Sequence, residues 1–213
     1  MIKPDVPAFP DDAMLEETVK DALENGVDIE HKRFYGEEMP FVHGRMVEFN
    51  GCIFEKCTFG ENEIERIVFV DCIFKKCDLS RFNLQKSTLQ RVQFSECRLT
   101  GAGFEHAVLM SVSMNQCQMD YCNFADAKFQ MVQFEDCSLR ESSFYSLKWK
   151  EWTVDRCSLI GCEFANTSLK DMDVTGCRIE GWRIDPYSLR GLKVTKEQAL
   201  TFAGLLGIKI MDL

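Results

Sequence analysis

The chain has 213 residues, 46% hydrophobic and 28% charged, which is the composition of one folded domain with a sizeable core and not of a disordered chain. Its formal net charge of −9 argues against direct nucleic-acid binding, which normally requires a basic face. The opening segment MIKPDVPAFPDDAM lacks an apolar leader pattern, and no stretch approaches the ~18 apolar residues of a membrane span. We therefore expect a cytoplasmic protein without membrane contact.

Residues 1–46 are predicted to form an N-terminal arm, a helix and an irregular first coil. Three prolines within the first ten residues favour an irregular arm. Asp12 is a candidate N-cap, and the apolar stripe that follows it, with Gly26 as a stop, predicts a short amphipathic helix that caps the first coil. His31 and His43 lie without partners at metal-binding spacing, and we expect both at the surface.

Residues 47–191 repeat in fives without an insertion or a deletion. Every fifth residue from Phe49 to Leu189 is apolar, 29 in all, and forms the centre of its five. A second inward position, two residues before each centre, is mostly small and holds all 11 cysteines. This pattern fits neither a helix nor a long strand, so the chain must turn a corner every five residues. It predicts a solenoid whose coils bury their apolar faces against one another.

Cysteine spacing indicates that four fives make one coil. One set of cysteines recurs at every fourth five: Cys57, Cys77, Cys97, Cys117, Cys137, Cys157 and Cys177. With three fives in a coil, these cysteines would stack on other kinds of residue; with four, they stack on one another. Stacked at a strand spacing of ~4.8 Å, roughly seven coils give a square rod on the order of 35 Å long with a dry interior.

The fives CDLSR, CRLTG, AGFEH, CNFAD and TSLKD resemble the pentapeptide-repeat family, whose pattern is a small residue, a polar residue, Leu or Phe, and two polar residues. The resemblance covers about two-thirds of the chain. It implies an all-β fold, a right-handed quadrilateral β-solenoid, here with a short N-terminal helix and a C-terminal dimerisation helix. It does not imply a single function, because members of the family have diverse roles.

The cysteines are interpreted as packing residues. Pairs such as Cys52 and Cys57 are five residues apart and do not form a C-x2-C knuckle, and without a secretory signal the thiols should stay reduced. We expect 11 buried free thiols, no metal and no cofactor, with redox or metal chemistry as the less favoured alternative.

Some inward positions hold residues of unexpected size or polarity. Most of the large ones fall in the last two coils, which must be wider than the others or turn some rings outward. These residues are Phe82, Leu147, Trp152, Met172, Trp182 and Tyr187, with Trp149 at a nearby centre. Asn62 is a polar residue at an inward site and needs a hydrogen-bond partner if it is buried.

Residues 192–213 are predicted to form a helix and dimerisation tail. Thr195 and Gln198 have the spacing of a capping box, Gly207 can stop the helix, and IKIMDL alternates like a short strand. The helix is too apolar for the exposed rim of a narrow rod, so we expect a two-fold homodimer. The residues expected at or near its interface are Trp182, Tyr187, Phe202, Leu205, Leu206 and Ile208.

The stretch TSLKDMDVTGCRIEGWRIDPYSLRGLKVTKEQALTFAGLLGIKI is similar to the tail of the Qnr group of quinolone-resistance pentapeptide proteins. In that group the tail helix joins two solenoids end to end, and the dimer resembles duplex DNA in shape and charge and binds type II topoisomerases. The uninterrupted frame lacks the loops of Gram-negative members, so the chain resembles the loop-less Gram-positive members.

The acidic side chains are unevenly placed. Residues 1–48 contain 12 acids and 5 bases, a net charge of −7, so the remainder is only −2. Centres four fives apart share a face, and acids concentrate on the faces that begin at Phe54 and Ile64, which we interpret as adjoining. The face that begins at Phe69 is basic, with Arg91, Lys128, Lys148, Lys150, Lys170 and Arg190.

The leading hypothesis is a DNA-mimicking dimer that binds DNA gyrase or topoisomerase IV and protects it from quinolones. The candidate partner-binding acids are Glu96, Glu105, Asp126, Glu135, Asp136, Asp155, Glu163 and Asp185. The alternative is a structural scaffold for another cytoplasmic protein. An enzyme is the least favoured hypothesis, because the sequence shows no nucleophile set, phosphate loop or paired-carboxylate pocket, and a filled rod offers no cleft.

Overall fold

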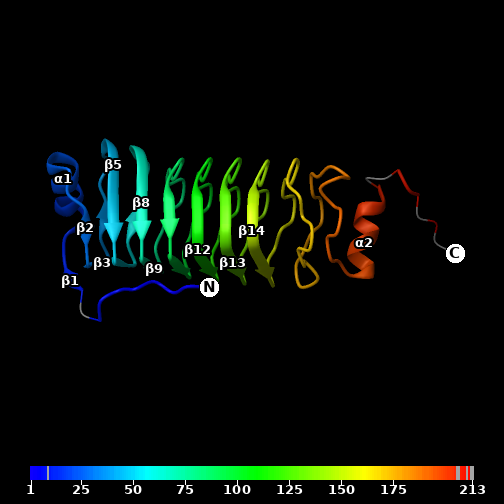
Figure 1. Cartoon of the computed structure of the whole chain (residues 1–213), viewed down its shortest axis with the longest axis horizontal. Helices are drawn as coiled ribbons and strands as arrows, with labels where there is room; N and C mark the ends of the chain where they lie inside the picture. The colour runs from blue at the N-terminus through cyan, green and yellow to red at the C-terminus, as the bar shows by residue number, and fades with distance from the viewer. Residues whose placement is uncertain (9, 205–206, 210, 212–213) are drawn as a thin grey trace.

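In the computed structural model, which describes residues 1–8, 10–204, 207–209 and 211, the chain winds into a rod of stacked coils with one helix at each end (Figure 1). The elements in chain order are β1 (Asp11–Asp12), α1 (Leu15–Asn25), β2 (Ile29–Glu30), β3 (Lys32–Tyr35), β4 (Glu38–Met39), β5 (His43–Asn50), β6 (Ile53–Glu55), β7 (Thr58–Phe59), β8 (Glu63–Val70), β9 (Ile73–Lys75), β10 (Thr88–Gln90), β11 (Gln93–Ser95), β12 (Val108–Asn115), β13 (Lys128–Glu135), β14 (Lys148–Asp155) and α2 (Lys196–Ala203). The fold is an all-β solenoid with four sides.

The pairing register confirms that four fives make one coil. Phe54 pairs in parallel with Phe34 on one side and with Phe74 on the other, and the same step continues to the pair of Phe134 and Val154. Single parallel bridges with this step extend to the last coils, where Asp173 pairs with Lys193. The coils therefore stack without slippage, since a slip by one residue would turn the apolar centres outward.

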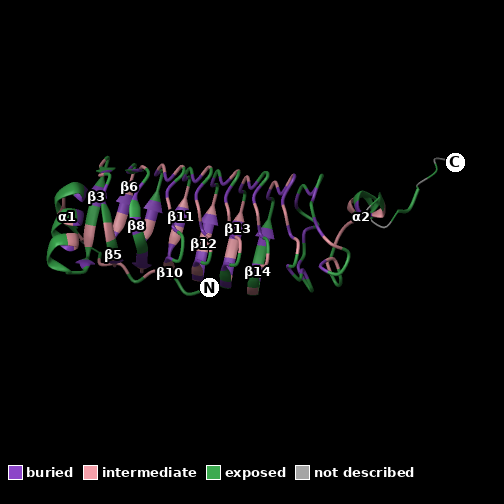
Figure 2. Ribbon diagram, turned by 90° about the horizontal axis from the view of Figure 1, so that it is seen from above, coloured by how far each residue is buried: buried purple, intermediate pink, exposed green. Residues whose placement is uncertain are grey.

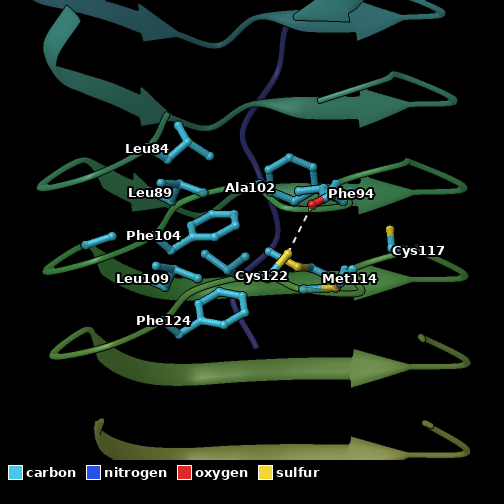
Figure 3. Packing of buried hydrophobic residues seen from close by; sticks show 14 of the residues in the cluster. Leu84, Leu89, Phe94, Ala102, Phe104, Leu109, Met114, Cys117, Cys122 and Phe124 are labelled. Atoms are coloured by element: carbon cyan, nitrogen blue, oxygen red, sulfur yellow. Dashed lines mark hydrogen bonds between the residues drawn. The ribbon is translucent and has the colours of Figure 1, made fainter. Parts of the chain in front are cut away.

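The interior is a continuous apolar core. The centres from Phe49 to Phe144 are all buried, and so are the inward positions that precede them (Figure 2). Aromatic rings stack along the rod, as in the pair Phe54 and Phe74, whose centroids are 4.6 Å apart. Figure 3 shows Leu84, Phe104 and Phe124 pointing inward from successive coils.

Most corners are made by one residue in the left-handed region. In most fives this is the second residue after the centre, as at Lys76 (φ 54°) and Glu96 (φ 54°). Such a conformation costs roughly 1–2 kcal/mol for a residue with a side chain. Neighbouring coils hold it in place, because the amide of Lys76 donates to the carbonyl of Ser95 in the next coil.

The oversized residues are accommodated in two ways. Trp152 points inward and lies between Phe129 and Phe144, with centroid distances of 5.3 Å and 5.0 Å. This ring fills the local interior, and Trp149 remains only partly buried. Tyr187 instead lies on the surface, at 75% exposure, because a turn organised by Asp185 replaces the regular corner.

The cysteines at the inward positions are buried as predicted, whereas the polar Asn62 is only partly satisfied by hydrogen bonds. All 11 cysteines are buried free thiols. The Sγ atom of Cys77, for example, lies 3.4 Å from the carbonyl oxygen of Phe54 in the preceding coil. Asn62 accepts the amide of Ile64 at 3.0 Å, while its Nδ2 has no partner within the described part of the chain.

Both helices close an end of the rod. The predicted N-cap at Asp12 is wrong, because Asp12 lies in β1 and Met14 occupies the cap position without a side-chain bond. The predicted stop at Gly26 is confirmed by its left-handed φ of 65°. Helix α2 has the predicted capping box of Thr195 and Gln198, but it ends at Ala203, before Gly207.

Candidate partner-binding faces

The rod has four faces, and we name each by one of its centres. They are, in order around the rod, the Phe54 face, the Phe59 face, the Ile64 face and the Phe69 face. Each face continues at every fourth five along the rod. Phe54 and Ile64 are two fives apart, which is half of a coil. The two acidic faces therefore lie on opposite sides of the rod, and the prediction that they adjoin is wrong.

On the Phe54 face, Arg156 gathers three of the predicted acids. Its guanidinium contacts Glu135 at 2.5 Å and Asp136 at 2.7 Å, and it also pairs with Asp155. The bonds from Arg156 lower the pKa of the Asp136 carboxyl. Because one cation serves three carboxylates, this cluster keeps a net charge of −2.

The other predicted acid near this side is Glu96. It occupies a left-handed corner position and is exposed. Its carboxylate lies 3.5 Å from the ammonium of Lys76 in the previous coil. An exposed pair of this kind is weak, so Glu96 can exchange this partner for another.

The Ile64 face carries the four other predicted acids. Glu105 accepts a bond from Asn123 at 2.7 Å, and Glu163 accepts one from Ser143 at 2.9 Å. Asp126 is exposed at a corner. These three side chains are partly or fully accessible and come from different coils, which gives the face a row of acids along the rod.

Asp185, the fourth acid of this face, has a structural role. Its carboxylate accepts bonds from the hydroxyl and amide of Ser188 and from the amides of Tyr187 and Asn166, at 2.7–3.0 Å. The hydroxyl of Ser188 and these amides lower its pKa to about 2. A carboxylate with four internal donors has little capacity left for a partner.

Sequence reasoning missed the bases that neutralise acids across coils. Arg156 follows Asp136, and Arg91 follows Asp71, each at a spacing of 20, and Arg91 makes two bonds of 2.6 Å. The same spacing identified the coil and would have found both pairs. Arg183, which bonds Glu141 at 2.9 Å across two coils, has a spacing of 42 and gives no such signal.

The Phe69 face is basic around a half-buried indole. Lys128, Lys148 and Lys150 are exposed and share a shallow groove with Trp149. The Trp149 indole N–H donates to the carbonyl of Ser168 at 2.7 Å. This face separates the two acidic faces along one side of the rod.

At the C-terminal end the predicted interface residues divide into buried and exposed groups. Trp182 and Phe202 are buried against each other, with ring centroids 5.7 Å apart. Tyr187 and Ile208 are exposed. Leu205 and Leu206 lie outside the described residues, so the homodimer remains a prediction.

Within the described ranges, no group of three or more His, Cys, Asp or Glu side chains is arranged to hold a metal ion. In the same part of the chain, neither helix has the length and apolar character required to cross a membrane.

Comparison with known proteins identifies the repeat. The family described as Pentapeptide repeat region matches residues 47–113 and 87–164, together more than half of the chain. No curated protein matches the sequence.

Solved structures that match the chain include full-length QnrB1, described as a plasmid-mediated fluoroquinolone resistance protein, at 20% identity over 93% of this chain and 95% of that one, with a TM-score of 0.44. HetL, a pentapeptide repeat protein involved in heterocyst differentiation regulation from the cyanobacterium Nostoc sp. strain PCC 7120, is 11% identical over 85% of this chain and 95% of its own, with a TM-score of 0.35. A pentapeptide repeat protein from the Arabidopsis thaliana thylakoid lumen is 21% identical over 46% of this chain and 66% of its own, with a TM-score of 0.37.

Proposed function

This chain belongs to the pentapeptide-repeat family, and on that premise we propose that it is a DNA-mimicking protein that binds DNA gyrase or topoisomerase IV and protects the enzyme from quinolones. The C-terminal sequence carries the resemblance to the Qnr group on which the choice of partner rests. The interaction needs no catalytic residue in this chain, because it depends on shape and charge alone.

The observation that supports mimicry is the placement of carboxylates on opposite faces of one rod. Duplex DNA presents phosphates on both of its flanks, and a protein groove that holds it is basic on both walls. Glu163 on the Ile64 face and Asp155 on the Phe54 face offer negative charge in opposite directions. A rod with this pattern can occupy such a groove without nucleic acid.

The Arg156 cluster favours the alternative of a protein scaffold. Glu135, Asp136 and Asp155 are already paired with Arg156, and the Phe69 face is basic. A partner that binds these faces would need basic groups opposite the acids and acidic groups opposite the lysines, and would not require a uniformly acidic surface. Affinity purification from a bacterial lysate separates the hypotheses: topoisomerase subunits support mimicry, and other proteins support a scaffold.

The direct test reverses charge on the Ile64 face. A variant with Glu105→Lys, Asp126→Lys and Glu163→Lys changes the net charge by +6 and leaves Arg156 and its partners in place. We expect it to fold and to lose its effect on gyrase supercoiling, with and without a quinolone. The effect of the unmodified protein should weaken as salt rises, because exposed charges are screened within about 8–10 Å.

A matched control reverses three exposed acids in and just after helix α1, at the N-terminal end of the rod: Glu17→Lys, Glu24→Lys and Asp28→Lys. This variant has the same net charge as the test variant and should act like the unmodified protein. A second set, Glu135→Lys, Asp136→Lys and Asp155→Lys, tests the Phe54 face. Mimicry is wrong if the variants reversed on the Ile64 face and on the Phe54 face both act like the original, or if the original affects neither topoisomerase.

A further inference from the structure

The N-terminal arm, residues 1–10 with residue 9 outside the described part, lies along the rod and does not project from it. In Figures 1 and 2 the chain runs from the α1 end along the coils, and its N-terminus lies near β12. In Figure 3 the same dark blue trace passes behind the stacked coils. The arm therefore crosses several coils at a steep angle to their strands.

The arm covers the Phe54 face. Met1 and Lys3 line one groove together with Gln93, Ser113 and Glu135. We call this the arm groove. Gln93 and Ser113 are the outward residues that precede the centres Phe94 and Met114, and Glu135 belongs to the acid cluster around Arg156. One of the two candidate partner-binding faces is thus occupied by the chain itself.

A specific contact anchors the arm. The amide of Asp5 donates to Oδ1 of Asp71 at 2.9 Å. Asp71 is 7% exposed and also accepts both bonds of Arg91. Burial raises the pKa of Asp71, but the bonds from Arg91 and from the Asp5 amide outweigh it and leave the pKa below its ordinary value. The arm therefore binds the charged and nearly buried carboxylate of Asp71, which lies at a corner of the coil and is held in place by Arg91.

The length and composition of the arm fit this path. Asp11 pairs with Lys32 in the next coil, and Asp71 lies two coils beyond Lys32, so Asp5 reaches an acceptor three coils from Asp11. Three coils span about 14 Å at strand spacing. Six residues of extended polyproline conformation span up to about 19 Å. Pro4, Pro7 and Pro10 restrict the free arm, so docking it costs less conformational entropy than docking a flexible peptide would.

We propose that the N-terminal arm is a tethered occupant of the Phe54 face, which a partner must displace before it can bind the acids at the end of the arm groove. The inference rests on the proposed function, because it concerns the same acidic face. Lys3 lies in the same groove as Glu135, so the arm offers this face the positive charge that a basic partner would bring. The apparent affinity of that partner equals its affinity for the open face multiplied by the fraction of molecules whose face is open.

Shielding can be measured without a partner. Ser113→Cys places a thiol in the arm groove, and Ser143→Cys places one at the equivalent outward position of the opposite Ile64 face. We then compare the rates at which a thiol reagent labels these two positions in arm variants. Asp5→Pro removes the N–H that anchors the arm. Ala8→Pro is the control, because the N–H of Ala8 makes no hydrogen bond to another described residue. Deleting residues 2–8 gives the rate for a fully open face.

Asp5→Pro should speed labelling of the thiol introduced at position 113 about tenfold or more, because a hydrogen bond to a charged group changes an equilibrium by at least that factor. The deletion should speed it further. Labelling of the thiol introduced at position 143 should not change with any arm variant, and Ala8→Pro should leave both rates unchanged. Equal labelling at position 113 with and without the arm would show that the arm does not shield the groove, and the proposal would be wrong.

Competition between the arm and a partner for the Phe54 face is then measured with gyrase as the partner. If the arm is inhibitory, Asp5→Pro and the deletion should act on supercoiling at concentrations about tenfold lower than the unmodified chain. Equal potency of all three proteins would overturn the regulatory part of the proposal. If none of them acts on gyrase or topoisomerase IV, the proposed function fails, while the labelling rates still decide whether the arm covers the face.

Discussion

The ring of Phe202 packs on the indole of Trp182 with their centroids 5.7 Å apart, so helix α2 closes the last coil of the rod. The Trp182 indole N–H donates to the carbonyl of Leu159 at 2.7 Å, which fixes the ring inside the coil. A solenoid needs such a cover at each end, because its terminal coil would otherwise expose the apolar interior.

We therefore predict that Phe202→Ala lowers the free energy of unfolding by about 3 kcal/mol, the usual cost of removing a buried aromatic ring. Leu200→Ala on the same helix should change it by less than about 0.5 kcal/mol, because Leu200 is exposed. Urea denaturation followed by circular dichroism measures both. An equal, small effect of the two substitutions would show that α2 does not cover the core.

A second prediction concerns the thiols. All 11 cysteines are buried, and burial raises the pKa of the Cys162 thiol to about 12. Since the thiolate is the reactive form, a thiol reagent should label fewer than about one cysteine in the native protein and all 11 in urea. Rapid labelling of most cysteines, or a stoichiometric metal in the purified protein, would contradict the packing interpretation.

The architecture was predictable because it follows from a period. The recurrence of Cys57 and Cys77 at a step of four fives determines the coil, and the register of Phe54 with Phe74 follows from it. The same arithmetic places the Phe54 and Ile64 faces half a coil apart. That they are opposite could have been deduced from the sequence alone.

Other features were not predictable from a periodic pattern. The contact between Asp5 and Asp71 joins distant parts of the sequence, and only Asp71 belongs to the repeat. The outward position of Tyr187 depends on the turn that Asp185 organises, which breaks the frame locally. Contacts made by irregular segments depend on tertiary packing and leave no recurring signal in the sequence.

A third prediction tests Asp185. Its folded-state pKa of about 2 is lower than the ordinary 3.8, so the bonded carboxylate stabilises the fold above about pH 3.8, and this contribution is lost as the pH falls toward 2. Asp185→Asn should lower the free energy of unfolding at pH 7, and its difference from the unmodified chain should shrink near pH 2. Asp126→Asn, at an exposed corner, should have little effect at pH 7. A difference for Asp185→Asn that does not change with pH would contradict this role.

The last prediction is a two-fold homodimer through the C-terminal end. Ile208 is exposed near the end of the rod, and Leu205 and Leu206, which lie outside the described residues, add to the apolar character of this segment. An apolar end of this kind is best buried against its own copy, since a two-fold interface uses the same patch twice.

Leu205→Asp combined with Leu206→Asp should therefore convert the dimer to monomers, as measured by light scattering across a range of concentrations, and Ile208→Asp should weaken it. Met14→Asp provides the matched control, because Met14 is an exposed apolar residue at the opposite end of the rod. That variant should remain dimeric. If the unmodified chain is already a monomer at all concentrations, helix α2 is only a cover for the last coil, and a DNA-mimicking rod would have to act with half the predicted length.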